Sequence, residues 1–172
     1  MTIKDLNENE FDPYYGRYIH KLSEHIELTE GFQNGKTKVF QFFNSMPENK
    51  LSHRYASGKW SIKEILQHLV DTERIFMYRC FRIARNDKTP LAGFDQNIYM
   101  SPSGADNKPI DLLLNEFTAT RYASIALLDS LSAEDLNCIG KSNGGAMSAR
   151  AAAFTIIGHD IWHMDTIKEK YL

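Results

Sequence analysis

Two histidines stand four residues apart near the end of the sequence, in 158-GHDIWHMD-165. If this segment is helical, His159 and His163 lie one turn apart on the same helix face. Neutral imidazole is a common ligand of divalent metals, so the pair could hold a metal ion. Two buried histidines could instead hydrogen-bond to backbone carbonyls, water or carboxylates. A third ligand elsewhere in the chain is therefore needed to favour the metal.

His68 is the best candidate for that third ligand. It lies in 65-ILQHLV-70, among residues that otherwise resemble a buried core. Two histidines in a metal site are normally joined by at least one further protein ligand, and three histidines would leave a coordination position open, as in catalytic sites. The other histidines lie in polar surroundings and are expected at the surface: His20, His25 and His53.

Two carboxylates are close to these histidines in the sequence, Glu64 and Asp160. Either could orient an imidazole N–H, although Glu64 is also expected to cap a helix. The segment HDIWH is similar to the HExxH motif of zinc proteases, with Asp160 in place of the glutamate that acts as general base. No ligand-bearing helix follows it, so a protease of that kind is not favoured.

The elements that must position these residues are helices. The clearest one begins in 60-WSIKEI-65, where Ser61 and Glu64 form a predicted capping box. It should continue to about Arg85 and carry His68 on its apolar face. Three further helices are predicted, over residues 27–46, 109–131 and 148–172.

The segment 86–108 is rich in Gly, Pro, Asn and Asp and lacks helical periodicity. A connection of this length can run along a whole bundle, so the helices before and after it can be parallel. It could also act as a lid that places Phe94 and Tyr99 over a pocket. A second segment, 140-GKSNGGAM-147, is expected to be a flexible loop.

The chain has 172 residues, of which 42% are hydrophobic and 24% charged, and its net charge is −2. Such a composition is typical of a soluble globular protein, and residues 1–172 are expected to form a single domain with 1–26 as a loosely assigned N-terminal extension. The small net charge without a basic helix face disfavours nucleic-acid binding. Neither a signal-like start nor a membrane-spanning segment is found, so a cytoplasmic protein is expected.

Cys80 and Cys138 form no CxxC motif and are expected to be small buried residues in a reducing compartment. Neither neighbours a histidine, so no catalytic nucleophile is assigned. Arg79, Arg82 and Arg150 are candidates for binding the carboxylates of a thiol cofactor, but a solvated surface position is favoured for each.

Three segments together resemble the DinB/YfiT-like superfamily of metal-dependent enzymes: 59-KWSIKEILQHLVDTERIF-76, 93-GFDQ-96 and 158-GHDIWHMDTI-167. The resemblance extends over residues 27–172. It implies an all-α fold, a four-helix bundle with up-down-down-up connectivity and a long crossover between its second and third helices.

The resemblance also implies one divalent metal ion bound by His68, His159 and His163. Three imidazoles suit Zn, Ni or Fe, so the identity of the ion stays open. Characterised relatives are similar to thiol-dependent transferases or isomerases that use a low-molecular-weight thiol, and others are described as hydrolases. A metal-dependent enzyme of one of these classes, acting on a small-molecule substrate, is therefore expected, and a homodimer is also implied. The alternative is a helical bundle that binds a small ligand or a protein partner and performs no chemistry.

Overall fold

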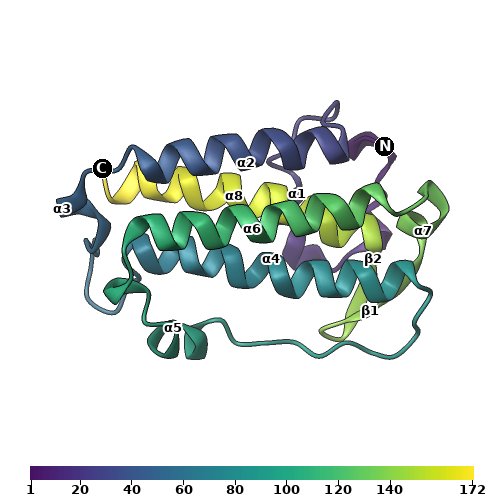
Figure 1. Cartoon of the computed structure of the whole chain (residues 1–172). Coiled ribbons are helices and arrows are strands. Elements are labelled where there is room, and N and C mark those ends of the chain that lie inside the picture. The colour runs from purple at the N-terminus through teal and green to yellow at the C-terminus, as the bar shows by residue number, and fades with distance from the viewer.

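Four long helices form the body of the molecule. The computed structural model describes all residues, 1–172, and places these helices side by side as a bundle (Figure 1). Their bounds are α2 Leu28–Asn44, α4 Ile62–Ala84, α6 Ile110–Asp129 and α8 Ala149–Lys170. α4 and α6 run in one direction, and α2 and α8 run in the opposite direction. The predicted four-helix bundle with up-down-down-up connectivity is confirmed.

Short elements precede and connect the long helices. α1 Gly16–Ile19 follows 3₁₀ turns at Ile3–Asp5, Glu8–Glu10 and Pro13–Tyr15. The remaining elements are α3 Glu48–Leu51, α5 Asn97–Ser103, a 3₁₀ turn at Ala105–Asn107, α7 Ala133–Asn137, and an antiparallel hairpin of β1 Ile139–Ser142 and β2 Gly145–Ser148. None of the helices combines the length and the hydropathy that crossing a membrane requires.

The two helices that carry the histidines begin at side-chain caps. The Ser61 hydroxyl accepts from the backbone N–H of Glu64 at 3.1 Å, and the Glu64 carboxylate accepts from the N–H of Ser61 at 2.8 Å. At the start of α8, the Ser148 hydroxyl accepts from the N–H of Ala151 at 3.0 Å. These bonds satisfy amides that the first turn of a helix leaves unpaired, and so fix where α4 and α8 begin.

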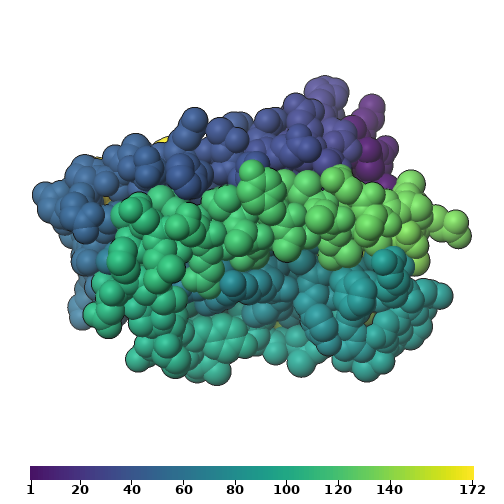
Figure 2. All heavy atoms as spheres, viewed as in Figure 1, coloured from purple at the N-terminus to yellow at the C-terminus, as the bar shows by residue number.

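The crossover, residues 85–109, runs along the bundle between α4 and α6 as its length predicts, but the expectation that it lacks helical structure is wrong. It contains α5, which is too short to show a helical period in the sequence and buries Met100 against the bundle. The carboxylate of Asp95 accepts from the N–H of Asn97 at 2.9 Å and fixes the start of α5. In the space-filling view, α6 and the crossover lie over this face, and α8 is almost hidden (Figure 2).

The segment 140–147 is a β-hairpin, so the expectation of a flexible loop is wrong. Asn143 and Gly144 have φ values of 52° and 84°, and an Asn-Gly pair is the favoured two-residue hairpin turn because both positions need positive φ. Leu91 of the crossover donates its N–H to the carbonyl of Lys141 at 2.9 Å and accepts from the N–H of Asn143 at 2.9 Å. The hairpin therefore holds one end of the crossover in place.

The core consists of two apolar halves. One half lies around the start of α8 and the C-terminal part of α4, and the other lies around the end of α8 and the N-terminal part of α4. Between them is a layer of buried polar side chains, which we call the polar layer: His68, Glu73, Arg121, His159, Asp160 and His163. Burying polar groups costs free energy unless they have partners, so this layer is where a functional site is expected.

Candidate metal centre

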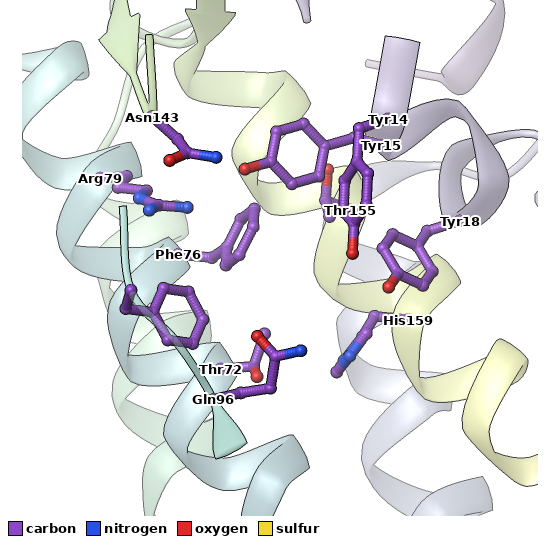
Figure 3. Close-up of a pocket in the computed structure, with 11 residues that line it drawn as sticks. Tyr14, Tyr15, Tyr18, Thr72, Phe76, Arg79, Gln96, Asn143, Thr155 and His159 are labelled. Carbon is purple, nitrogen blue, oxygen red and sulfur yellow. The ribbon is translucent and has the colours of Figure 1, made fainter. Parts of the chain in front are cut away.

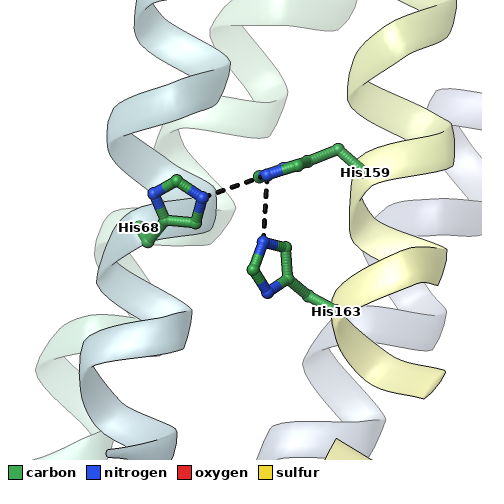
Figure 4. Close-up of side chains that lie close together, drawn as sticks. All are labelled: His68, His159 and His163. Carbon is green, nitrogen blue, oxygen red and sulfur yellow. Dashed lines mark hydrogen bonds between the residues drawn. The ribbon is translucent and has the colours of Figure 1, made fainter. Parts of the chain in front are cut away.

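The three predicted histidines meet in the polar layer (Figure 4). His68 points inward from α4, and His159 and His163 point inward from successive turns of α8. Nε2 of His159 lies 3.0 Å from Nε2 of His68 and 3.1 Å from Nε2 of His163. The candidate ligand atoms of all three side chains lie within 4.8 Å of one another. We call these three residues the histidine cluster.

Hydrogen bonds between the rings cannot account for both short contacts. An uncharged imidazole nitrogen offers either one N–H or one lone pair in the plane of the ring. Nε2 of His159 can therefore pair with only one of its two neighbours, and the other contact stays unsatisfied. A cation between the three rings could accept the Nε2 lone pair of each histidine. The ligand atoms of a tetrahedral zinc ion lie about 3.3 Å apart, which is close to the 3.0 and 3.1 Å between these nitrogens.

Burial keeps the three rings uncharged. It lowers the pKa of His68 to about 4. The pKa values of His159 and His163 lie well below the ordinary histidine value because of burial and, to a smaller extent, because of the neighbouring imidazoles. The uncharged ring is the form that binds a metal, so this donor set suits a divalent cation at neutral pH.

Each histidine of the cluster packs against one aromatic ring. The ring centroids are 4.7 Å apart for Trp60 and His68, 4.7 Å for Trp162 and His163, and 5.0 Å for Tyr18 and His159. An apolar wall of this kind restricts the rings and limits the access of water to the site.

Neither carboxylate that was expected to orient a histidine does so. Glu64 caps α4, and Asp160 accepts from Arg121 at 2.6 Å. The polar partner of the cluster is Thr72, whose hydroxyl lies 3.3 Å from Nδ1 of His68. The only signal for Thr72 in the sequence is its spacing, one helical turn after His68.

Asp160 belongs to a buried ion-pair network beside the cluster. Arg121 donates to the two oxygens of Glu73 at 2.8 Å each and to Asp160 at 2.6 Å. Burial raises the pKa of Asp160 to about 6, against the opposing effect of Arg121. Because Asp160 is held by Arg121, it does not occupy the place of the general base in the protease motif that HDIWH is similar to.

A cavity of about 120 Å³ reaches the histidine cluster at His159 (Figure 3). Its walls come from α4, α8, the hairpin, the crossover and the N-terminal segment. The lining residues are Tyr14, Tyr15, Tyr18, Thr72, Phe76, Arg79, Phe94, Gln96, Asn143, Thr155 and His159. We call it the tyrosine cavity.

The three tyrosines of this cavity were missed by the sequence analysis, which gave residues 1–26 no role. Their close spacing at Tyr14, Tyr15 and Tyr18 was the only available signal. Phe94 lines the cavity, as the lid interpretation predicted, but Tyr99 does not and instead stacks on Phe94 with ring centroids 5.8 Å apart.

A second cavity, of about 230 Å³, reaches the cluster at His163. Its walls include Trp60 and Trp162, together with Asn97 from the start of α5. The histidine cluster is therefore reached from two cavities, and the crossover contributes to both.

The remaining predicted residues lie outside the cluster. His20, His25 and His53 are exposed, as expected. Cys80 is buried, Cys138 is partly buried, and both are free thiols.

The three arginines differ, and a solvated position is wrong for two of them. Arg82 lies at the C-terminal end of α4 and donates from Nε to Asp87 at 2.6 Å. Arg150 is buried and donates to Glu10 at 2.8 Å. Arg79 is also buried and lines the tyrosine cavity. Burial of Arg150 depends on a partner in the N-terminal segment, which its own sequence neighbourhood does not reveal.

Comparison with known proteins agrees with this architecture. The sequence profile of the DinB superfamily matches residues 32–167. A protein of Oceanobacillus iheyensis that is described as a candidate metal-dependent hydrolase is 22% identical over 152 residues, which cover 87% of this chain and 85% of that protein.

Two solved structures share the fold. YfiT from Bacillus subtilis, described as a probable metal-dependent hydrolase with an unusual four-helix bundle topology, has a TM-score of 0.73 at 16% identity and covers 86% of this chain and 89% of its own. A mycothiol-dependent maleylpyruvate isomerase has a TM-score of 0.68 at 10% identity, and the match covers 96% of this chain but 62% of the isomerase.

Proposed function

The chain belongs to the DinB superfamily, and we propose that it is an enzyme that depends on one divalent metal ion held by His68, His159 and His163. The observation that supports this proposal best is the double contact of His159, whose Nε2 lies within 3.1 Å of two other imidazole nitrogens and can hydrogen-bond to only one. Three ligands leave a coordination position for a reactant.

The residues around the cluster have defined tasks in this proposal. Thr72 accepts the Nδ1 proton of His68, which leaves the Nε2 lone pair free for the ion. The tryptophans and Tyr18 shield the site from bulk water. Burial raises the pKa of Tyr18, so its hydroxyl stays protonated and can donate a hydrogen bond to a molecule in the tyrosine cavity. An ion held by the three histidines would supply Lewis acidity, which would lower the pKa of a water or a thiol bound to it.

Among the two reaction classes, we favour thiol-dependent transfer or isomerisation over hydrolysis. The cluster is reached from two cavities, one at His159 and one at His163. Two cavities suit a reaction that brings a thiol and a second molecule to one ion, whereas hydrolysis needs only one organic substrate. The mycothiol-dependent isomerase of the same fold supports this choice.

The metal content of the purified protein tests the first part of the proposal. We expect about one divalent ion per chain by elemental analysis, without added metal. A preparation that neither contains nor binds such an ion would support the alternative, a helical bundle without chemistry.

The reaction class is tested by assaying the metal-loaded protein in two ways. One assay follows the turnover of an electrophile with and without a low-molecular-weight thiol, which detects transfer and also isomerisation, in which the thiol is regenerated. The other follows the hydrolysis of simple esters and amides without a thiol. We expect turnover in the first assay that is abolished by a chelator and restored by the ion. Metal-dependent hydrolysis without thiol consumption would instead favour the hydrolase.

A further inference from the structure

Arg79 is a buried cation without a carboxylate partner. Its side chain is 2% exposed, Nη2 donates to the carbonyl of Ala92 at 3.0 Å, and Nη1 has no hydrogen-bond partner. The other two buried arginines are paired, Arg121 with Glu73 and Asp160 and Arg150 with Glu10. The missing partner therefore distinguishes Arg79.

The surroundings of Arg79 hold its guanidinium in place without neutralising it. The guanidinium carbon lies 4.8 Å from the ring centroid of Phe76 and 5.5 Å from that of Phe94. Aromatic faces attract a cation but accept no conventional hydrogen bond. Burial lowers the pKa of Arg79, the nearby uncharged Tyr15 hydroxyl opposes this shift, and arginine stays protonated in proteins. Nη1 of Arg79 is therefore a donor on a charged group, and burying it without an acceptor costs free energy.

The tyrosine cavity contains no acidic residue. Arg79 is the only residue of fixed charge among those that line it, and its neutral polar neighbours there include Gln96, Asn143 and Tyr14. Figure 3 shows the guanidinium directed into this space from one side, with His159 at the other end. A molecule in the cavity can thus reach an arginine fork and the histidine cluster at the same time.

We propose that the tyrosine cavity binds a carboxylic acid, whose carboxylate accepts from Arg79 while its other end reaches the histidine cluster. The planar fork of arginine matches a carboxylate better than a spherical anion. His68 and Arg79 are separated by three turns of α4, about 16 Å along the helix axis, and the long arginine side chain spans part of this distance. The bound acid is accordingly an extended molecule. This inference rests on the proposed function, since it assigns the far end of the acid to the metal.

Two matched series of probes test the proposal on the metal-loaded protein. ω-Mercaptoalkanoic acids of increasing length carry a thiol for the metal and a carboxylate for Arg79, and ω-mercaptoalkanamides of the same lengths lack only the charge. Calorimetry gives the dissociation constants, and the absorption of a cobalt-substituted protein reports thiol binding to the metal. We expect the acid of best length to bind about tenfold or more tightly than its amide.

Variants assign this preference to one residue. Arg79→Gln should abolish the advantage of acid over amide, and Arg79→Lys should keep part of it, because lysine retains the charge without the fork. Arg82→Gln removes an arginine three residues later that pairs with Asp87 outside the cavity, and should leave the preference unchanged. Equal binding of acid and amide to the native protein, or a preference that survives in Arg79→Gln, would overturn the proposal.

Hexanoate and hexanamide separate this proposal from the proposed function. They have no thiol, and the Arg79→Gln variant distinguishes a carboxylate held by Arg79 from one that coordinates the metal. If the thiol series leaves the cobalt spectrum unchanged and hexanoate still binds better than hexanamide through Arg79, the carboxylate site stands and the metal assignment fails. If thiols bind the metal but charge makes no difference in either series, the metal assignment stands and the carboxylate site fails.

Discussion

The carbonyl oxygen of Tyr18 lies where a side chain on Gly158 would begin, since a Cβ at this position would come within 2.1 Å of it. This contact allows α1 to approach α8 one residue before His159. It also places the ring of Tyr18 5.0 Å from the ring of His159. The glycine is therefore required for the N-terminal segment to reach the histidine cluster.

Gly158→Ala should lower the free energy of unfolding by about 1–3 kcal/mol, the usual cost of overpacking a well-packed interior. In an unobstructed helix the same change would stabilise the protein by about 1 kcal/mol, so the sign of the effect is informative. Urea unfolding of the two proteins measures the difference, and a more stable alanine variant would contradict the close approach of α1.

Substitution of any cluster histidine should remove the metal. We expect His68→Ala, His159→Ala and His163→Ala to contain little divalent ion by elemental analysis. His20→Ala is the matched control, because His20 is exposed and pairs with Glu8 at 2.9 Å. Full metal content in His68→Ala would reject the three-histidine site.

Thr72→Val should weaken metal binding about tenfold, which is the lower end of the range for a residue that orients a metal-binding histidine. The substitution removes the hydroxyl near Nδ1 of His68 and preserves the shape of the side chain. Competition with a coloured chelator measures the affinity.

Thr118→Val is the control for this experiment, since Thr118 donates to the carbonyl of Leu114 within α6 at 2.7 Å. Equal metal affinities of the Thr72 and Thr118 variants would show that the hydroxyl near His68 has no such role.

Arg121→Met should lower the free energy of unfolding by about 3–5 kcal/mol, because it leaves the buried carboxylates of Glu73 and Asp160 without their cation. Asp160→Asn should have a smaller effect, because Glu73 still pairs with Arg121. Both variants should retain the metal when folded, as judged by circular dichroism and elemental analysis. Loss of turnover in a stable, metal-loaded Asp160→Asn protein would instead indicate that Asp160 takes part in catalysis.

The ion pair of Glu10 and Arg150 should make stability sensitive to acid. Burial alone would raise the pKa of Glu10, but hydrogen bonds from Arg150, Ser148 and Asn7 lower it from 4.5 to about 2. The folded protein thus holds this proton less tightly than the unfolded chain. The stability that Glu10 contributes is complete above pH 4.5 and is lost as the pH falls to about 2.

Glu10→Gln should therefore be less stable than the native protein at neutral pH and should lose less stability on acidification. Urea unfolding at pH 7 and at several pH values between 4.5 and about 2 measures both effects. Glu8→Gln is the control, because Glu8 is exposed and its partner is the exposed His20. If plots of the free energy of unfolding against pH stay parallel for the native protein and Glu10→Gln through this range, the stabilising role of the ionised Glu10 is contradicted.

The parts of the structure that depend on local chemistry could be predicted from the sequence. The start of α4 follows from Ser61 and Glu64, and the inward position of His68 follows from the amphipathic period of that helix. α8 is buried on nearly all sides from Ala149 to Asp160, so for His159 and His163 the sequence offered only their spacing of one helical turn. The Asn143–Gly144 pair was a hairpin signal that the surrounding glycines obscured. The expected homodimer and cytoplasmic location stay predictions.

The environment of Arg79 could not be predicted in the same way. Its lack of a carboxylate partner depends on the hairpin, the crossover and the N-terminal segment, which are distant in the chain. The same is true of Asp160, whose neighbours in the sequence suggested a histidine partner, whereas its actual partner, Arg121, comes from α6. Pairing across a bundle is set by packing, and packing is not encoded in the spacing of one segment.

The crossover supplies Phe94 and Gln96 to the tyrosine cavity but no member of the histidine cluster. Mutations in this connecting segment can therefore change which molecules fit the tyrosine cavity, while the histidine cluster carried by α4 and α8 stays the same. A bundle built in this way can acquire new ligands during evolution without losing its candidate metal centre.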